Sequence, residues 1–270
     1  MTTSTAIEPR NEPRNKRLAR SGQMPLLRVV GVELRKMFDT RAGFWLVASI
    51  AIAGTLATLV TMLFAPDTDL TYSTFATAVG FPMTVILPMI SLLSITGEWS
   101  QRTGLTTFTL VPDRRQVMAA KTISAVVVAV ASMLFALVIG ALGNLVGSSI
   151  ADTQLVWDMS PAHGATIIVG NLIGLMTGTM LGMLIRNSAG ALVAYFSYSL
   201  ILPTLAGLLA ASQDWFRDLQ PWVDLNYAQS ALFVGSLTGE QWANLAVTVA
   251  TWVLLPGAIG LALVMRSEVK

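Results

Sequence analysis

Long apolar stretches alternate with short polar ones along most of this 270-residue chain. Six stretches each hold the roughly 20 apolar residues that a helix needs to cross a bilayer core of about 30 Å. They are nearly free of charge, and polar residues, glycine or proline separate them. The pattern predicts an all-α membrane protein with six transmembrane helices, at approximately residues 44–65, 72–96, 121–147, 163–185, 190–212 and 243–265.

Basic residues gather in alternate connections between these spans. Of the 17 lysines and arginines, only Arg217 lies in the connections at 66–71, 148–162 and 213–242, which also hold most of the acidic residues. Connections rich in lysine and arginine stay on the cytoplasmic side of a membrane. The distribution therefore predicts a multi-pass protein of the cell (plasma or inner) membrane with both termini in the cytoplasm.

The segments outside the spans have distinct patterns. Residues 1–22 are polar and basic and predict a disordered cytoplasmic tail. Residues 23–43 predict an amphipathic helix in the interface plane, ahead of a transmembrane domain at 44–266. Residues 213–242 predict an outer amphipathic or re-entrant segment whose aromatic residues suit the membrane interface. The apolar face predicted for the interface helix consists of Leu27, Val30, Leu34, Met37 and Phe38.

Glycine and proline give two further expectations about packing. The fourth span repeats glycine every four residues, which predicts a smooth strip where another helix approaches closely, within the chain or in a second subunit. Pro82 and Pro88 indicate that the second span is either strongly bent or discontinuous, or carries a static packing kink. The strip consists of Gly170, Gly174, Gly178 and Gly182.

Composition narrows the chemistry. Only 12% of residues are charged, against roughly 25% in soluble domains, and cysteine is absent. There is no phosphate-binding loop of the Gly-x-x-x-x-Gly-Lys-Ser/Thr kind, and the single histidine, His163, is expected to be an interfacial or capping residue. No ionisable residue falls in the middle of a span, which argues against proton- or sodium-coupled transport. We therefore predict no catalytic or metal site, and the net charge of +2 gives no argument for nucleic-acid binding.

The connection at 97–120 mixes charged with apolar residues. It is too long for a tight turn and too apolar for a solvated linker. It either docks into a groove of another protein or folds against the ends of its own helices.

The residues around this connection resemble the permease subunits of ABC-2 type ATP-binding-cassette transporters. In that family an interface helix with Glu-Leu-Arg-Lys or similar precedes the first span, as residues 33–36 do here. The second span then ends in Gly-Glu, followed by Arg/Lys-Thr-Gly, a Pro-x-x-Arg helix and a lysine that opens the third span. The matching residues are Gly97, Glu98, Trp99, Arg102, Thr103, Gly104, Pro112, Arg115 and Lys121.

The resemblance implies a non-enzymatic permease with partners. Two copies, or one copy and a sister permease, would associate with separate ABC ATPase subunits that bind ATP and Mg, so no cofactor is expected in this chain. The connection at 97–120 would be a coupling helix. The implied ATPase-docking residues are Glu33, Arg35, Glu98, Trp99, Arg102, Leu105, Phe108, Arg114 and Arg115. The second and fifth spans would line the substrate pathway with Phe81, Met83, Met89, Phe196, Tyr198 and Leu202.

The expected function is ATP-driven export of a hydrophobic or amphipathic compound, such as a drug, antibiotic, peptide or lipid. The alternative is a non-transport membrane module that recruits an ATPase for sensing or self-immunity. An intramembrane enzyme is disfavoured, because no pair of catalytic groups is present for it.

Overall fold

The computed structural model describes residues 24–39, 41–100 and 113–266, and all regular structure in this part of the chain is helical. The predicted tail at 1–22 lies outside the described residues. The elements in chain order are α2 (Leu26–Asp39), α3 (Arg41–Phe64), η1 (Asp67–Asp69), α4 (Tyr72–Ser100), α6 (Arg114–Ile150), α7 (Pro161–Ile185), α8 (Ser188–Phe196), η2 (Ser197–Ile201), α9 (Leu202–Ser212), α10 (Asp214–Val223), α11 (Leu225–Ser230), η3 (Ala231–Phe233), α12 (Gly239–Val249), η4 (Ala250–Leu254) and α13 (Leu255–Arg266).

Six helical segments are long and apolar enough to cross a membrane, which confirms the predicted all-helical, six-span architecture. The largest difference is in the third span, where α6 begins at Arg114 and runs without a break to Ile150. The six segments are Gly43–Phe64, Tyr72–Ser100, Arg114–Ile150, Pro161–Ile185, Ser188–Ser212 and Gly239–Arg266.

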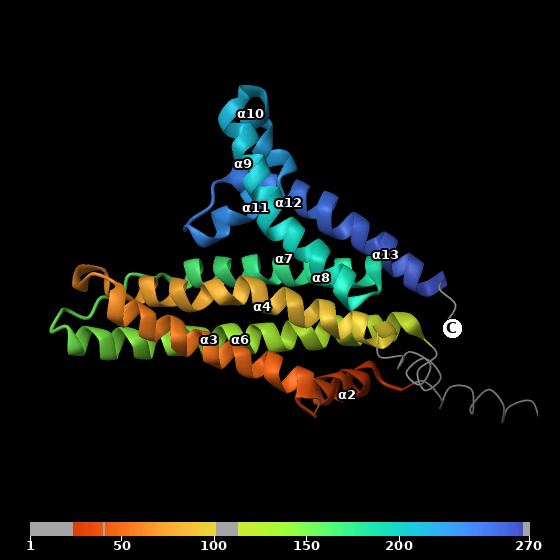
Figure 1. Cartoon of the computed structure of the whole chain (residues 1–270), viewed down its shortest axis with the longest axis horizontal. Coiled ribbons are helices and arrows are strands. Elements are labelled where there is room, and N and C mark those ends of the chain that lie inside the picture. The colour runs from red at the N-terminus through yellow and green to blue at the C-terminus, as the bar shows by residue number, and fades with distance from the viewer. Residues whose placement is uncertain (1–23, 40, 101–112, 267–270) are drawn as a thin grey trace, which may run out of the picture.

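The first four spans form an elongated bundle, in which α4 packs against α3, α6 and α7 (Figure 1). Its core contains flexible and branched apolar side chains, among them Met83, Leu87, Met133 and Leu175. Between helices in lipid there is little hydrophobic driving force, so close packing and small residues decide which faces meet. α2 lies at the end of this bundle where α4 ends and α6 begins (Figure 1). We call it the α2 end.

The glycine strip of α7 lies inside the molecule. A Cβ atom added to Gly178 would collide with the backbone of Pro88, and one added to Gly182 would lie 3.2 Å from the carbonyl oxygen of Leu92. A Cβ atom at Gly170 would lie 2.7 Å from the ring of Phe233. The strip therefore lets α7 approach α4 and η3 within the same chain, the first of the two alternatives above.

α4 passes through both of its prolines as one helix. A proline within a helix has no N–H for the carbonyl group four residues earlier. For Pro88 this is the carbonyl of Thr84, and the hydroxyl of Tyr195 in α8 donates to it at 2.9 Å. A side chain of the fifth span thus replaces the missing backbone donor, as transmembrane helices with proline require.

The last two spans share a local irregularity. Each contains a π-helical turn, η2 or η4, that is followed at once by Leu-Pro, at residues 202–203 and 255–256. Wider turns of this kind accommodate a break in the regular hydrogen bonding of a helix. Both spans run obliquely to the first four (Figure 1). In the most apolar 18 residues of the fifth span, 6% of the positions are buried, against 50% in the fourth span. Most of the fifth span therefore faces outward.

At the end of the bundle opposite α2, the loop before α7 caps α4. The carboxylate of Asp158 accepts hydrogen bonds from the backbone N–H of Ser73 at 2.8 Å and from its hydroxyl at 2.6 Å. A carboxylate satisfies unpaired N–H groups at a helix start and interacts favourably with the helix dipole. Further along, the predicted outer segment at 213–242 folds into α10, α11, η3 and the start of α12, with Trp215 and Trp222 exposed.

Candidate functional site

The amphipathic helix α2 is fixed to the start of α6 by one of its faces. Val29, Val30 and Met37 are buried on this face, and Val29 and Val30 pack with Ala120 of α6. The hydroxyl of Ser124 in α6 also donates to the carbonyl oxygen of Val30 at 3.2 Å. Of the apolar face predicted from the sequence, Val30 and Met37 are buried here, whereas Leu27 and Phe38 are exposed.

Four charged side chains meet where α2, α4 and α6 come together. Lys121 of α6 places its Nζ atom 2.7 Å from Oε2 of Glu33 in α2 and 2.9 Å from Oε1 of Glu98 in α4. Lys36 of α2 lies 2.7 Å from Oε1 of Glu33 and 3.7 Å from Oε1 of Glu98. We call these four residues the charged tetrad. It joins three helices through side chains from distant parts of the sequence.

The tetrad is largely shielded from solvent and balanced in charge. Glu33, Glu98 and Lys121 are each 4% exposed, whereas Lys36 is 44% exposed. Burial acts to lower the pKa of Lys36, but the hydrogen bond to Glu33 and the charges of Glu33 and Glu98 outweigh it, so the pKa is raised. Lys36 thus stays cationic at neutral pH, and two lysines balance two glutamates. Buried charges persist only with such partners, since removing one leaves another without compensation.

The geometry makes the tetrad a mechanical tie. The backbone of α2 cannot move away from α4 and α6 unless the ion pair of Glu33 with Lys121 and that of Lys36 with Glu98 break, the first of them in a poorly solvated site. Glu98 lies near the end of α4 and Lys121 near the start of α6, so their ion pair also links these two helix ends directly. A force applied to α2 is therefore transmitted to the ends of the second and third spans.

The structure separates the predicted docking residues into groups. Glu33 and Glu98 point into the tetrad and are shielded from a partner, while Arg35 and Arg115 are exposed. The coupling segment predicted at 97–120 is helical at both ends, because residues 97–100 complete α4 and α6 begins at Arg114. Its centre lies outside the described residues, and with it the predicted sites Arg102, Leu105 and Phe108.

Trp99 and Arg114 contribute to a second junction at the same end. Trp99 packs on an apolar cluster that includes Ile95, Val117 and Val264. Nη1 of Arg114 donates to the backbone carbonyl oxygen of Val264 at 3.0 Å. These contacts join the start of the third span to the end of the sixth, so both predicted docking residues also have partners within the chain.

The six predicted pathway residues do not line one cavity. Met83 is in the bundle core, whereas Phe81 and Leu202 are exposed on the outer surface. Met89 and Phe196 both pack against a small cluster of Leu92, Ala191 and Tyr195 between α4 and α8. Tyr198 instead packs beneath α11 and α12.

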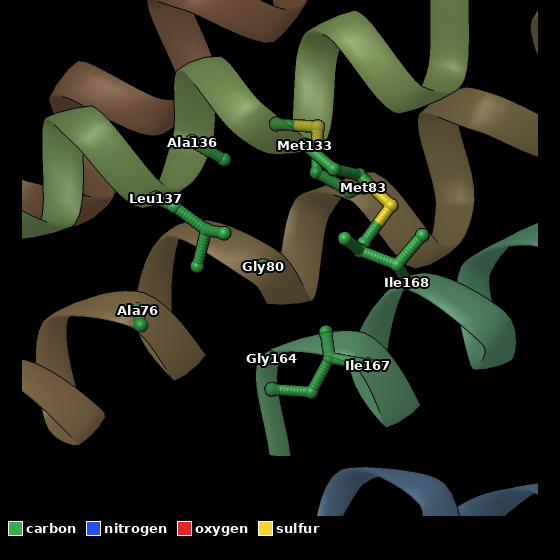
Figure 2. A pocket seen from close by; sticks show the side chains of 9 residues that line it. All are labelled: Ala76, Gly80, Met83, Met133, Ala136, Leu137, Gly164, Ile167 and Ile168. Carbon is green, nitrogen blue, oxygen red and sulfur yellow. The ribbon is translucent and has the colours of Figure 1, made fainter. Parts of the chain in front are cut away.

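Met83 lines an apolar crevice between α4, α6 and α7 (Figure 2). Gly80, Met133 and Ile167 line it as well. Its free volume is about 10 Å³, which at most admits a single water molecule. This crevice is therefore no cargo site in the present conformation.

Sequence reasoning missed the roles of Lys36 and Lys121 as the cations that balance Glu33 and Glu98. The spacing of Glu33 and Lys36, three residues apart on a helix, is a local signal for an ion pair. Nothing local connects Glu33 with Lys121. His163 is not the capping residue of α7: Ser160 is, and its hydroxyl oxygen accepts a hydrogen bond from the backbone N–H of His163 at 3.1 Å. Nε2 of His163 lies 3.2 Å from the carbonyl oxygen of Phe233.

Among the described residues, no group of three or more histidines and carboxylates is arranged to hold a metal ion. No protein-family model matches the chain, and no curated protein matches it either. The resemblance stated above therefore depends on the motif residues and the topology alone.

Proposed function

We propose that this chain is the membrane subunit of an ABC-2 type transporter, with ATP hydrolysis in a separate subunit. Two copies, or one copy and a sister permease, form the transmembrane unit. It exports a hydrophobic or amphipathic compound, and both termini and the α2 end face the cytoplasm. The observation that carries the proposal is the charged tetrad. It links the amphipathic helix α2 to α4 and α6, and these two helices flank the connection that resembles a coupling segment.

The tetrad supports this function because such a transporter must convert movement of its ATPase into movement of its spans. An ATPase that presses on α2 or on residues 101–112 acts directly on the ends of α4 and α6. The tie transmits this force with little loss, since separating its charges is costly away from water. The exposed Arg115 is available for polar contacts at this end.

The experiment that tests the proposal is co-purification with an ABC ATPase encoded beside this chain, in detergent and with or without nucleotide. Leu105→Asp places a charge in the connection, and we expect it to release the ATPase. Leu155→Asp is the matched control, because Leu155 is an exposed leucine in the loop at the opposite end. The control variant is expected to retain the ATPase as the wild type does.

Two outcomes would contradict the proposal. If the wild type retains no ATPase in any nucleotide state, the permease has no energy source. If both leucine variants release the ATPase equally, binding does not depend on the connection. When docking is established, labelled compounds in reconstituted vesicles separate export from the non-transport alternative.

A further inference from the structure

The surface at the α2 end is strongly basic, because the arginines outside the tetrad outnumber the carboxylates there. Four carboxylates are described at this end, and the tetrad shields two of them, Glu33 and Glu98. Outside the tetrad, the described residues there carry seven arginines and only two aspartates, Asp39 and Asp113. Since the tetrad itself is neutral, this surface has an excess of positive charge.

The excess charge lies beside an apolar stripe on α2. A helix turns by about 100° per residue, so Leu27 and Phe38 lie within about 20° of each other around its axis. Both are exposed, by 82% and 52% respectively. Arg28 and Arg35 likewise fall within about 20° of each other, roughly a quarter turn from that stripe. The buried face, with Val29 and Met37, points the other way.

Further exposed apolar side chains follow α2 in the chain. Phe44 and Trp45 are exposed at the beginning of the first span, directly after α2. A helix with an apolar face and flanking basic residues at the start of a span lies at the boundary between headgroups and acyl chains. Neither Arg28 nor Arg35 forms an ion pair within the described part of the chain. Their guanidinium groups are free to bind phosphate oxygens in pairs.

We infer that Arg28 and Arg35 form a binding surface for anionic phospholipids of the adjacent leaflet, with Leu27 and Phe38 inserted at the acyl boundary. The lipid phosphates neutralise the arginines, and the acyl chains cover the apolar stripe that water would otherwise meet. A protein partner is the competing occupant, and it would leave unexplained why α2 directly precedes an apolar span that begins with the exposed Phe44 and Trp45. The inference requires neither an ATPase nor transport.

The absence of cysteine allows a local test on the full-length protein. Leu27→Cys supplies a single thiol for a fluorophore, and the labelled protein is placed in nanodiscs of phosphatidylcholine and phosphatidylglycerol. Quenching by spin-labelled phosphatidylglycerol is compared with quenching by spin-labelled phosphatidylcholine. We expect the anionic lipid to quench more strongly, and added salt to reduce the difference.

Two double variants identify the arginines responsible. Arg28→Gln with Arg35→Gln is expected to lower the preference for phosphatidylglycerol by about 5-fold for each arginine, or about 30-fold together. Arg115→Gln with Arg266→Gln removes the same charge from exposed positions outside α2 and is expected to retain most of the preference. All four arginines are at least partly exposed at this end, and equal thermal unfolding of both variants verifies that the fold is intact.

Three results would overturn the inference. The first is equal quenching by the two lipids in the parent protein. The second is an equal loss of preference in both double variants, which would show general attraction by charge without a site. The third is quenching by a water-soluble agent that an added ATPase blocks, which would make this face of α2 a protein-docking surface.

Discussion

Replacing Lys121 with methionine tests whether the charged tetrad holds α2 to the bundle. Methionine is close to lysine in length and volume, so the variant removes the charge and leaves the packing nearly intact. Glu33 and Glu98 then remain in a site where each is 4% exposed. Lys36 still contacts Glu33 at 2.7 Å and lies 3.7 Å from Glu98, so the two glutamates then share the charge of Lys36, and Glu98 loses its 2.9 Å contact with Lys121.

The expected cost follows from that geometry. Removing one partner of a buried ion pair typically costs about 3–5 kcal/mol, because the other charge stays buried without compensation. The remaining contacts of Lys36 place Lys121→Met near the lower end, at about 3 kcal/mol. At about 1.4 kcal/mol for each factor of ten, the population with α2 detached rises on the order of 10²-fold.

A single cysteine beneath α2 measures this detachment. Val30 is buried against α6, and the chain has no other thiol, so Val30→Cys reacts with a maleimide only when α2 lifts away. We expect Lys121→Met to raise the labelling rate on the order of 10²-fold in this background. A thiol at Val234, which is exposed at the far end, is the control and is expected to react at an unchanged rate.

A variant without the three buried charges makes the reasoning refutable. Replacing Glu33, Glu98 and Lys121 together by methionine leaves only Lys36 of the tetrad charged, and water can solvate Lys36 because it is 44% exposed. Exchanging buried ion pairs for apolar residues of similar volume is often neutral or stabilising. We therefore expect the triple variant to label nearly as slowly as the parent. Labelling that is unchanged in Lys121→Met, or equally fast in both variants, would show that the tetrad is not the tie.

Three other predictions concern the packing of the spans. Gly178→Ala places a methyl group against the backbone of α4 and is expected to lower the unfolding free energy by about 1–3 kcal/mol in denaturant titrations. Gly207→Ala is the control: this position has open space, so the unfolding free energy should be unchanged or raised. Tyr195→Phe leaves the carbonyl oxygen of Thr84 without its donor and should cost about 1 kcal/mol in the same assay. Burial acts to raise the pKa of Asp158, but hydrogen bonds from the first turn of α4 outweigh it and lower the pKa. Its stabilisation is complete above the unfolded pKa of about 4 and is lost as pH falls through the folded value, so melting temperatures of wild type and Asp158→Asn should converge in acid.

The six spans could be predicted because their signal is local. A helix that crosses lipid must satisfy its backbone internally and cover about 30 Å with apolar side chains, so length and composition are sufficient. The third span shows the limit of this reasoning. Its helix begins at Arg114 and extends beyond the apolar stretch, with a charged first turn at the α2 end. Apolar length alone does not indicate where such a helix begins.

The tetrad could not be predicted because its partners lie far apart in the chain. A glutamate at the polar end of a span, such as Glu98, is expected at the surface, since ionised carboxylates are rarely buried without a partner. The partner, Lys121, follows a connection whose path the sequence does not determine. The pathway residues failed to assemble for a related reason: Met83 and Phe81 are two positions apart, and helical spacing alone does not say which side meets a neighbouring helix and which meets lipid.

The distribution of contacts also indicates where the proposed transporter changes shape. The tetrad ties α2 to α4 and α6, and the glycine strip holds α7 against α4, so these helices move together when α2 is pushed. The fifth span has little buried surface, and a π turn followed by proline interrupts both it and the sixth. Relative movement is therefore easiest between the bundle of the first four spans and the last two. Under the proposed function, spin labels on α6 and α9 should change their separation when nucleotide binds the ATPase, while labels on α2 and α6 should not. The opposite pattern would place the movement at the tetrad and refute its role as a rigid tie.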